Sequence, residues 1–482
     1  MTCSSPKELS KRLSGHFPHV PTGGQERLIE AFSRFLFSDK PKCTLIVKGY
    51  AGTGKTTSIG AIVRTLIEIR RAFVMLAPTG RAAKVMASYS GIAAHTIHRC
   101  IYRSKTRSDG EQGYTLAENK FKNAVFIIDE ASMIGADSGL LDDLMEYVFS
   151  SKGCRLILVG DGAQLPPVGC VTSPALDVAY LKPGFNLTAA EVELTEVVRQ
   201  EMDSSILINA HSLRLSIANA EPGSKVSVPK VDLGAGPDVI KLSGEDLQET
   251  IETLHGKYGE DGVVIITRSN KRAVLFNQHI RKRILWQDND INIGDRLMVV
   301  KNNYYWLREY DDIDDELIAN GDIVEVVRIA YRFKRYGYEF AEVDVVLVDI
   351  ENSPHLHLTV MTTILNDNKP SLTMAENKEL YKKIADDYID LGSKSKIHSA
   401  VIHDQCYQAL QVKYAYSLTC HKAQGGQWPA IILDQGYITE EMMDREWLRW
   451  LYTGFTRAVK ELYLLNFNHK FFLKIQGTKK PT

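Results

Sequence analysis

Short apolar runs alternate along the first half of the chain with stretches whose apolar residues recur at helical spacing. The runs CTLIVK (43–48), AFVMLA (72–77), AVFIID (124–129) and RLILVG (155–160) each have the length of a buried strand. The segments between them are compatible with helices, and this alternation is typical of a parallel sheet. The pattern therefore predicts an α/β domain.

A second series of strand-like runs lies in the C-terminal half of the chain. It comprises GVVIIT (262–267), AIIL (430–433) and ELYLLN (461–466), again with helical stretches between them. Residues 218–237 are rich in Gly, Pro and Ala and are typical of a surface linker. We therefore expect two α/β domains joined by this linker.

Two insertions interrupt the alternation of strands and helices. Residues 101–120 form two polar runs around an Asp-Gly turn, which predicts a projecting β-hairpin. Residues 321–411 begin with alternating, strand-like sequence and continue with the charged, helix-compatible stretch AENKELYKKIADDYIDLG. This second insertion predicts a small β-rich module inside the second domain.

The run GYAGTGKT (49–56) lies between a predicted strand and a predicted helix and fits the phosphate-binding pattern G-x-x-x-x-G-K-[ST]. Backbone N–H groups of such a loop wrap a polyphosphate, Lys55 reaches its outer phosphates, and the Thr56 hydroxyl can ligate Mg²⁺. The motif predicts binding of a nucleotide such as ATP with Mg²⁺, and leaves the use of that nucleotide open. The residues predicted to bind it are Gly52, Thr53, Gly54, Lys55, Thr56 and Thr57.

Polar groups follow two further predicted strands at the edge where α/β sheets bind ligands. VFIIDE (125–130) ends in two carboxylates, of which Asp129 is expected to hold Mg²⁺ and Glu130 to deprotonate the attacking water. Acidic pairs at strand ends are common at protein surfaces, but a P-loop upstream favours the catalytic interpretation. LVGDGAQLPPVG (158–169) delivers Gln164, a candidate sensor of the γ-phosphate.

Two arginines follow apolar stretches, Arg199 in ELTEVVRQ and Arg457 in YTGFTRA. An arginine directed at the γ-phosphate from a second domain would stabilise transition-state charge and couple chemistry to domain closure. On local sequence alone, a solvated surface arginine is the more common situation for both. Their interpretation depends on the rest of the chain.

Composition narrows the class of protein. The chain has 482 residues, 44% of them apolar, which is enough for a large core. A net charge of −1 argues against a uniformly basic coat but allows a local basic channel. Seven cysteines without a C-x-x-C pair predict neither a zinc site nor a disulfide framework, as in a reduced, cytoplasmic protein. No apolar run reaches the ~18 residues of a membrane span.

The ordered motifs resemble those of superfamily 1B helicases, in the RecD-like and phage Dda-like branch. They run from Gln25 to Arg457 and comprise VKGYAGTGKTT, LAPTGRAAKVM, AHTIHR, IIDEASM, GDGAQLPPVG, LTEVVRQ, YSLTCHKAQGGQW and YTGFTRA. The resemblance implies an α/β fold of two RecA-like P-loop NTPase domains, with a β-hairpin inserted in the first and an SH3-like module in the second. The expected boundaries are 1–215 for the first domain, 216–320 with 412–482 for the second, and 321–411 for the module.

In this family the two domains clasp ATP. The resemblance implies that Gln25 reads the adenine, although a glutamine near a helix start is also compatible with a capping box. By the same resemblance, Arg199 and Arg457 sense the γ-phosphate together with Gln164. Gly425 would help to link the DNA track to the nucleotide.

The resemblance also implies that hydroxyls, amides and basic groups on both domains grip single-stranded DNA. The 101–120 hairpin takes the place of the family's separation pin, where Tyr102 and Tyr114 would stack on the last base pair. His98 is also compatible with a core histidine because it follows Ile97, and Ala423 stands where the family usually has Ser. The residues expected to bind DNA are Thr79, Arg81, Thr96, His98, Tyr114, Thr267, Arg268, Asn270, Thr419, His421 and Lys422.

Three hypotheses follow. The first is an ATP-driven 5′ to 3′ DNA helicase that acts as a monomeric motor on single strands and on junctions with duplex, with repair or replication proteins as candidate partners. The second is a nucleotide-gated DNA-binding subunit of a repair complex. The third is an RNA helicase of the same superfamily, since no residue must read a 2′-hydroxyl. The intact catalytic set favours the first, and we expect no nuclease activity.

Overall fold

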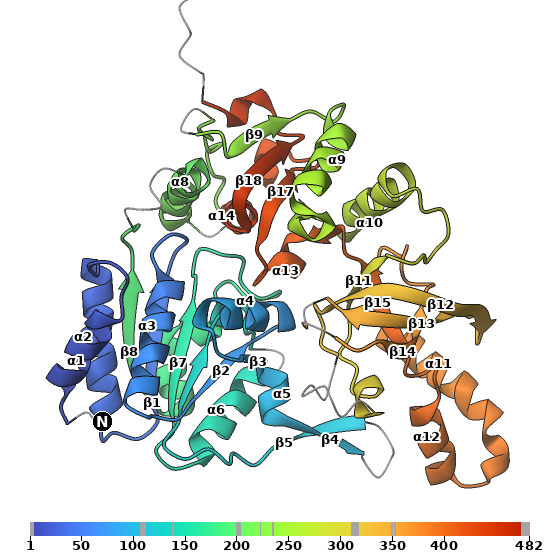
Figure 1. Cartoon of the computed structure of the whole chain (residues 1–482), viewed down its shortest axis with the longest axis horizontal. Coiled ribbons are helices and arrows are strands. Elements are labelled where there is room, and N and C mark those ends of the chain that lie inside the picture. The colour runs from blue at the N-terminus through green and yellow to red at the C-terminus, as the bar shows by residue number, and fades with distance from the viewer. Residues whose placement is uncertain are drawn as a thin grey trace, which may run out of the picture.

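The computed structural model describes residues 4–106, 112–136, 139–198, 204–221, 223–233, 236–309, 318–348, 350 and 353–473. The first domain is a six-stranded parallel sheet in the order β3-β2-β6-β7-β1-β8 (Figure 1). Its strands are β1 (Cys43–Gly49), β2 (Phe73–Ala77), β3 (His95–Thr96), β6 (Val125–Ile128), β7 (Arg155–Gly160) and β8 (Thr188–Leu194).

Helices cover both faces of this first sheet. Along β1, Leu45 and Val47 pack with α1, α2 and α3 on one face, while Ile46 packs with α5, α6 and α7 on the other. Because both faces are buried, these strands are continuously apolar, which made them recognisable in the sequence. The helices are α1 (Pro6–Gly15), α2 (Gly23–Phe37), α3 (Lys55–Glu68), α4 (Gly80–Ser90), α5 (Ile97–Ile101), α6 (Leu140–Ser150) and α7 (Val178–Phe185).

The second domain is a five-stranded parallel sheet in the order β16-β10-β17-β18-β9. Its strands are β9 (Val239–Leu242), β10 (Val263–Thr267), β16 (Ser417–Thr419), β17 (Trp428–Asp434) and β18 (Ala458–Leu465). Its helices are α8 (Ser205–Asn219), α9 (Leu247–Tyr258), α10 (Asn270–His279), α13 (Cys420–Ala423) and α14 (Arg445–Phe455). Every strand predicted from the apolar runs is present, which confirms the α/β fold class.

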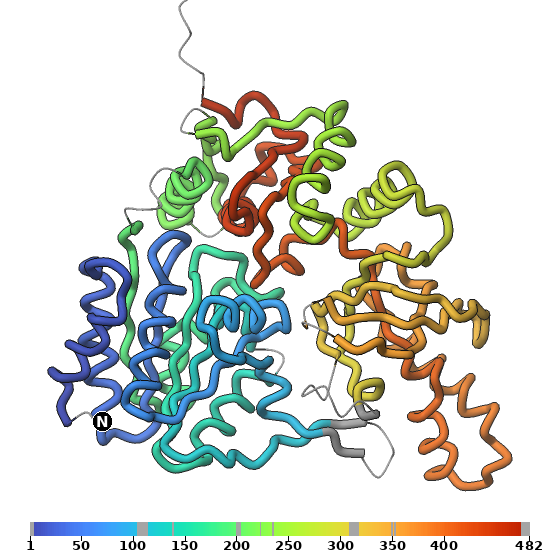
Figure 2. Tube along the Cα trace, in the orientation of Figure 1, coloured from blue at the N-terminus to red at the C-terminus, as the bar shows by residue number. Residues whose placement is uncertain are grey.

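A closed barrel of β11, β12, β13, β14 and β15 is inserted into the second domain. Figure 2 shows the chain leaving the second domain for the barrel and returning to it. Two helices, α11 and α12, extend from the barrel (Figure 1). The elements are β11 (Arg296–Val299), β12 (Ile323–Arg335), β13 (Tyr338–Leu347), β14 (Leu356–Met361), β15 (Leu410–Tyr414), α11 (Met374–Asp387) and α12 (Lys394–His403).

The observed units differ from the expected boundaries at two places. The barrel takes its first strand from before residue 321, because β11 pairs with both β12 and β15 and thereby closes the sheet. The boundary expected at 215–216 falls inside α8, whose Ile206, Leu213 and Ile217 belong to the core of the second domain. Both differences arise from pairing or packing between segments that are distant in sequence.

The hairpin expected at 101–120 is present as β4 (Tyr102–Thr106) and β5 (Gln112–Leu116), paired antiparallel. It projects from the first domain toward the side of the molecule where the barrel lies (Figure 1). No helix in the described part of the chain combines the length and apolar character that a membrane span requires.

A buried ion pair joins the second domain to the barrel. Arg281 lies in the π-helical turn η5 (Ile280–Ile284) that follows α10, and it contacts Asp295, which precedes β11. The Arg281 Nε and Nη2 atoms each donate to Asp295 at 2.8 Å, and Nη1 donates to the Tyr414 hydroxyl at 3.0 Å. Arg281 is 4% exposed and Asp295 is 0% exposed.

We expect Arg281→Ala to lower the free energy of unfolding of the second domain and barrel by about 3–5 kcal/mol, because it leaves a buried carboxylate without its cation. Urea denaturation followed by tryptophan fluorescence measures the change. Arg328→Ala is the matched control, since Arg328 also pairs with an aspartate, Asp344, but is 60% exposed, and it should cause a much smaller loss. Equal losses for the two variants would contradict the prediction.

Candidate functional site

The P-loop connects β1 to α3 and folds around the side chain of Lys55. Gly54 caps α3 with φ +77°, and a Cβ atom on Gly49 would lie 2.6 Å from Lys55 Cγ, so both positions require glycine. Lys55 Nζ donates to the carbonyl oxygens of Gly49 at 2.7 Å and Tyr50 at 2.9 Å. The loop thereby holds one cation beside the N-terminal amides of α3, an arrangement suited to a polyphosphate.

The structure places the other P-loop residues in two kinds of position. Thr53 is buried and its hydroxyl donates to Tyr50 O at 2.8 Å, so it braces the loop itself. Thr56 and Thr57 lie in the first turn of α3, with Thr56 exposed. Gly52 has φ +73°, which a glycine adopts without strain.

The two acidic residues follow β6 directly. Asp129 accepts hydrogen bonds from the Tyr89 hydroxyl at 2.7 Å and from the backbone N–H of Glu130 at 2.8 Å, which fix the orientation of its carboxylate. Glu130 has the left-handed backbone conformation, φ +51° and ψ +34°. This conformation is uncommon for a residue with a side chain, and such strain is concentrated at functional sites.

Arg457, from the second domain, faces Glu130 across the interface between the domains. Its Nη1 atom lies 3.7 Å from Glu130 Oε1, and the residue is 3% exposed. Burial raises the pKa of Glu130, an effect that the positive charge of Arg457 partly offsets. A partly buried acid at the end of β6 thus meets a buried cation from the other domain. Arg199, the second predicted arginine, lies outside the described residues.

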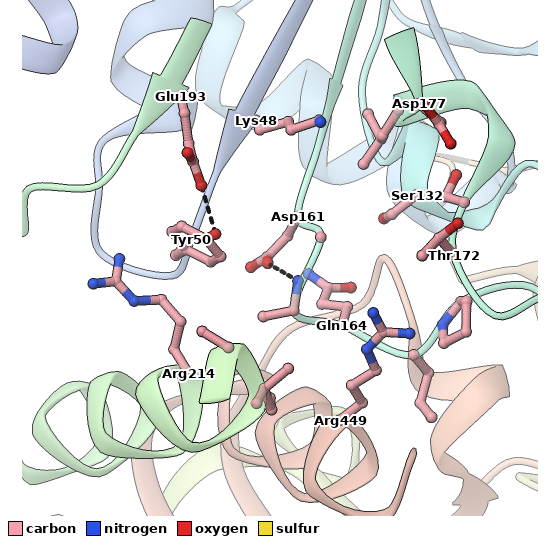
Figure 3. A pocket seen from close by; sticks show the side chains of 18 of the residues that line it. Lys48, Tyr50, Ser132, Asp161, Gln164, Thr172, Asp177, Glu193, Arg214 and Arg449 are labelled. Atoms are coloured by element: carbon pink, nitrogen blue, oxygen red, sulfur yellow. Dashed lines mark hydrogen bonds between the residues drawn. The ribbon is translucent and has the colours of Figure 1, made fainter. Parts of the chain in front are cut away.

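Gln164 is buried, and its Oε1 atom has no hydrogen-bond partner among the described residues. It lines an interdomain cavity of about 460 Å³ together with Tyr50, Asp161 and Arg449 (Figure 3). The walls come from the carboxyl edge of the first sheet and from α8 and α14 of the second domain. The predicted γ-phosphate sensor therefore lies at the junction of the two domains.

Gln25 caps a helix through its side-chain oxygen and places its side-chain nitrogen beside the P-loop. With Thr22 it forms a capping box at the start of α2, in which Gln25 Oε1 accepts from Thr22 N at 3.0 Å. Its buried Nε2 atom has no partner among the described residues and lies 2.5 Å from the position of a Cβ atom built on Gly54. The capping interpretation is confirmed, while the amide nitrogen remains available beside the P-loop.

Gly425, expected to help link the DNA track to the nucleotide, lies against the first domain. A Cβ atom built there would lie 2.8 Å from Ala82 Cβ and 3.4 Å from Thr79 Oγ1, so Gly425 abuts the start of α4 in the first domain. The second domain approaches α4 this closely because Gly425 has no side chain and adopts φ +73°.

A cavity of about 570 Å³, here called the polar groove, lies between the first domain, α13 and the barrel side of the second domain. The barrel side contributes Lys301, Asn302 and Asn320. Burial lowers the pKa of Lys422 to about 8 and lowers the pKa values of His98 and His421. The residues expected to bind DNA that line this groove are Thr79, Arg81, Thr96, His98, Tyr114, His421 and Lys422.

Four residues expected to bind DNA are absent from the described lining of this groove, namely Thr267, Arg268, Asn270 and Thr419. The Thr267 hydroxyl is buried and donates to Ser269 O at 3.1 Å, so it braces the turn after β10. The guanidinium of Arg268 lies 5.8 Å from the ring centroid of Trp450. Asn270 and Thr419 lie at the starts of α10 and α13.

The two hairpin tyrosines differ in their contacts. The Tyr102 hydroxyl donates to Asp143 in α6, which anchors the base of the hairpin to the first domain. Tyr114 is 41% exposed, and its ring centroid lies 4.5 Å from that of Tyr304, between β11 and β12. Tyr114 therefore reaches the groove and the barrel side of the molecule, whereas Tyr102 does not line the groove.

Sequence reasoning missed two residues at the interface, Asp161 and Tyr452. Both lie within motifs quoted above, GDGAQLPPVG and YTGFTRA, which gave a local signal but no pairing. The Tyr452 hydroxyl donates to Asp161 Oδ2 at 2.7 Å, and Asp161 lies 3.8 Å from Lys55 Nζ.

These elements define the class of protein. A P-loop, a carboxylate pair on a nearby parallel strand, and an arginine supplied by a second parallel-sheet domain constitute a P-loop NTPase of two RecA-like domains.

The comparisons with known proteins show which proteins the chain is similar to. A model of the AAA domain matches residues 23–221, and a model of the UvrD-like helicase C-terminal domain matches residues 414–465. The chain is 26% identical to the ATP-dependent DNA helicase Dda of Enterobacteria phage T4, over 84% of this chain and 90% of that protein. It is 27% identical to the ATP-dependent RecD2 DNA helicase of Deinococcus radiodurans, over 54% of this chain and 34% of that protein.

A crystal structure of the Pif1 helicase from Bacteroides with ADP-AlF3 and single-stranded DNA aligns with 94% of this chain and 95% of its own, at 14% identity and a TM-score of 0.48. The motif order and the sequence relatives make this chain similar to superfamily 1B helicases of the RecD-like and Dda-like branch.

The raised pKa of Glu130 predicts an acid limb in the pH dependence of ATP hydrolysis. Only the carboxylate can take a proton from water, so kcat should fall as the pH falls through this raised pKa, which lies above the value of about 4.3 of an exposed glutamate. Steady-state ATPase rates between about pH 5 and about pH 8 test this, with circular dichroism to establish that the fold persists. A rate that stays constant down to the pH at which the fold is lost would contradict the assignment of Glu130 as the base.

Proposed function

We propose that the chain is an ATP-driven DNA helicase that moves 5′ to 3′ along single-stranded DNA and separates duplex ahead of it. One observation carries the proposal: the interface that brings Arg457 to Glu130 also forms the polar groove. Residues of the first domain, α13 and the barrel side all line that groove. A change in the contact between the domains therefore changes the nucleotide site and the groove together.

Each catalytic residue is assigned a role by its position. Lys55 binds the outer phosphates of ATP, and Gln164 contacts the γ-phosphate. Glu130 takes the proton of the attacking water, and Arg457 stabilises the charge that develops on the transferred phosphoryl group. Because Arg457 belongs to the second domain, hydrolysis requires that domain to be docked. Gln25 is assigned to the adenine through its Nε2 atom.

The oxygen donors near the P-loop fit Mg²⁺, which prefers one or two carboxylates together with substrate phosphates. Asp129 is held in position by Tyr89, and Thr56 supplies a hydroxyl in the first turn of α3. When bound, Mg²⁺ would neutralise charge on the β- and γ-phosphates. Asp129 and Thr56 are the residues assigned to hold it.

The groove suits a single strand of nucleic acid because it combines cations and hydroxyls with an aromatic ring. Lys422, Lys301 and Arg81 supply positive charge for phosphates, and Tyr114 offers a stacking surface. ATP binding closes the cleft and hydrolysis reopens it, so the grips of the two domains on the strand alternate. We assign Arg268, Asn270 and Thr419 to a part of the DNA-binding surface that lies on the second domain, outside the groove.

We expect single-stranded DNA to stimulate the ATPase of the wild type, and Lys55→Ala to lower kcat by about 10²–10³-fold, because it removes a cation from the developing phosphate charge. Steady-state hydrolysis with and without an oligonucleotide measures both effects. Lys11→Ala, on the exposed surface of α1, is the control and should retain wild-type rates. Absence of stimulation would contradict the motor function, and full activity of Lys55→Ala would contradict the site.

A separate experiment tests the direction of movement along the DNA strand. Forked or tailed duplexes with a single-stranded 5′ tail should be unwound in the presence of ATP and Mg²⁺, and those with only a 3′ tail should not. Strand separation is followed by gel or by fluorescence, with Lys55→Ala as the inactive control. Unwinding from the 3′ tail alone would reverse the assigned direction.

A further inference from the structure

Tyr452, in α14 of the second domain, reaches the P-loop of the first. Its hydroxyl accepts a hydrogen bond from Ala51 N at 2.9 Å and donates one to Asp161 Oδ2 at 2.7 Å. Tyr452 and Asp161 are each 1% exposed. One side-chain oxygen of the second domain therefore binds two groups of the first domain, the buried Asp161 carboxylate and the Ala51 N–H in the phosphate-binding loop.

The partners of this hydroxyl lie next to the catalytic lysine. Asp161 Oδ2, the atom that Tyr452 contacts, is 3.8 Å from Lys55 Nζ, and Asp161 Oδ1 accepts from Ala163 N at 2.9 Å. Burial raises the pKa of Tyr452 well above its ordinary value, so the phenol keeps its proton and donates a hydrogen bond to Asp161.

Neighbouring contacts attach the loop after β7 to the second domain. Leu165 N donates to Thr453 Oγ1 at 2.9 Å, and Leu165 O accepts from Gln424 Nε2 at 2.8 Å. Arg449 Nη1 donates to Val171 O at 2.6 Å. Gln424 also lines the polar groove, so this loop connects the groove, the domain interface and the carboxylate beside Lys55.

We propose that Tyr452 is a positioning residue. When the second domain is docked against the first, its hydroxyl holds Ala51 and Asp161 in position around Lys55, and this contact is lost when the domains separate. This inference rests on the proposed function, in which hydrolysis occurs only in the docked state. Tyr452 acts through Ala51 and Asp161 and does not touch the reacting phosphate.

The role predicts a specific kinetic effect. Without the hydroxyl, the docked state leaves the Ala51 N–H and Asp161 Oδ2 without this hydrogen bond, whereas the undocked state loses nothing at this place. Docking then becomes less favourable. Tyr452→Phe should lower kcat about tenfold and leave the KM for ATP within about twofold of the wild type.

Tyr416→Phe is the matched control. The Tyr416 hydroxyl also accepts from a backbone N–H, that of Arg296 at 3.2 Å, and donates to a buried aspartate, Asp295, at 3.4 Å. These contacts lie between the second domain and the barrel and do not cross to the P-loop. Both variants should lower the melting temperature, but Tyr416→Phe should keep the wild-type kcat.

The experiment measures kcat and KM for ATP with and without single-stranded DNA, and the melting temperature, for the wild type, Tyr452→Phe and Tyr416→Phe. A wild-type kcat for Tyr452→Phe, an effect confined to KM, or an equal loss of kcat in Tyr416→Phe would overturn the inference. If Tyr452→Phe does not fold, Asp161→Asn, which weakens the same hydrogen bond, takes its place with the same expected loss of kcat. If DNA does not stimulate the wild type, the proposed function fails, and the comparison of basal kcat still decides the role of Tyr452.

Discussion

The carboxyl ends of parallel strands lie at one edge of a sheet, and the chemistry of this protein depends on that constraint. β1, β7 and β6 are neighbours in the first sheet, so the P-loop, Asp161 and the Asp129–Glu130 pair are brought to a single edge although they are far apart in sequence. The second domain faces this edge with α13, α14 and the residues that lead into β17 and β18. The candidate nucleotide site therefore lies at the junction of the two domains, where Arg457 approaches Glu130.

The interface between the two domains contains polar contacts beside the P-loop. Tyr452, Thr453 and Gln424 bind backbone or carboxylate groups of the first domain instead of packing as apolar residues. Hydrogen bonds of this kind are directional, and they leave buried groups unpaired when they break. An interface built in this way favours discrete docked and undocked arrangements, which is what a motor driven by a nucleotide requires.

The two insertions, the barrel and the hairpin, bring parts of both domains to the groove. The barrel is joined to the second domain by the buried Arg281–Asp295 pair. The hairpin belongs to the first domain through Tyr102, yet Tyr114 meets Tyr304 on the barrel side. The groove is therefore enclosed by parts of both domains, and its shape depends on how the domains pack against each other.

The sequence by itself determined the strands of both sheets, the P-loop and the acidic pair, because apolar periodicity, glycine turns and the residues that follow a strand are local properties. It also indicated that Gln25 caps a helix. Only the tertiary structure decided that β11 closes the barrel, that the Thr267 hydroxyl is used internally, and that Gly425 abuts α4. The contact between Ala51 and Tyr452 joins residues 401 positions apart, and no local pattern specifies such a pair. It exists because elements of two separate sheet domains pack against each other, and that packing is a property of the folded chain.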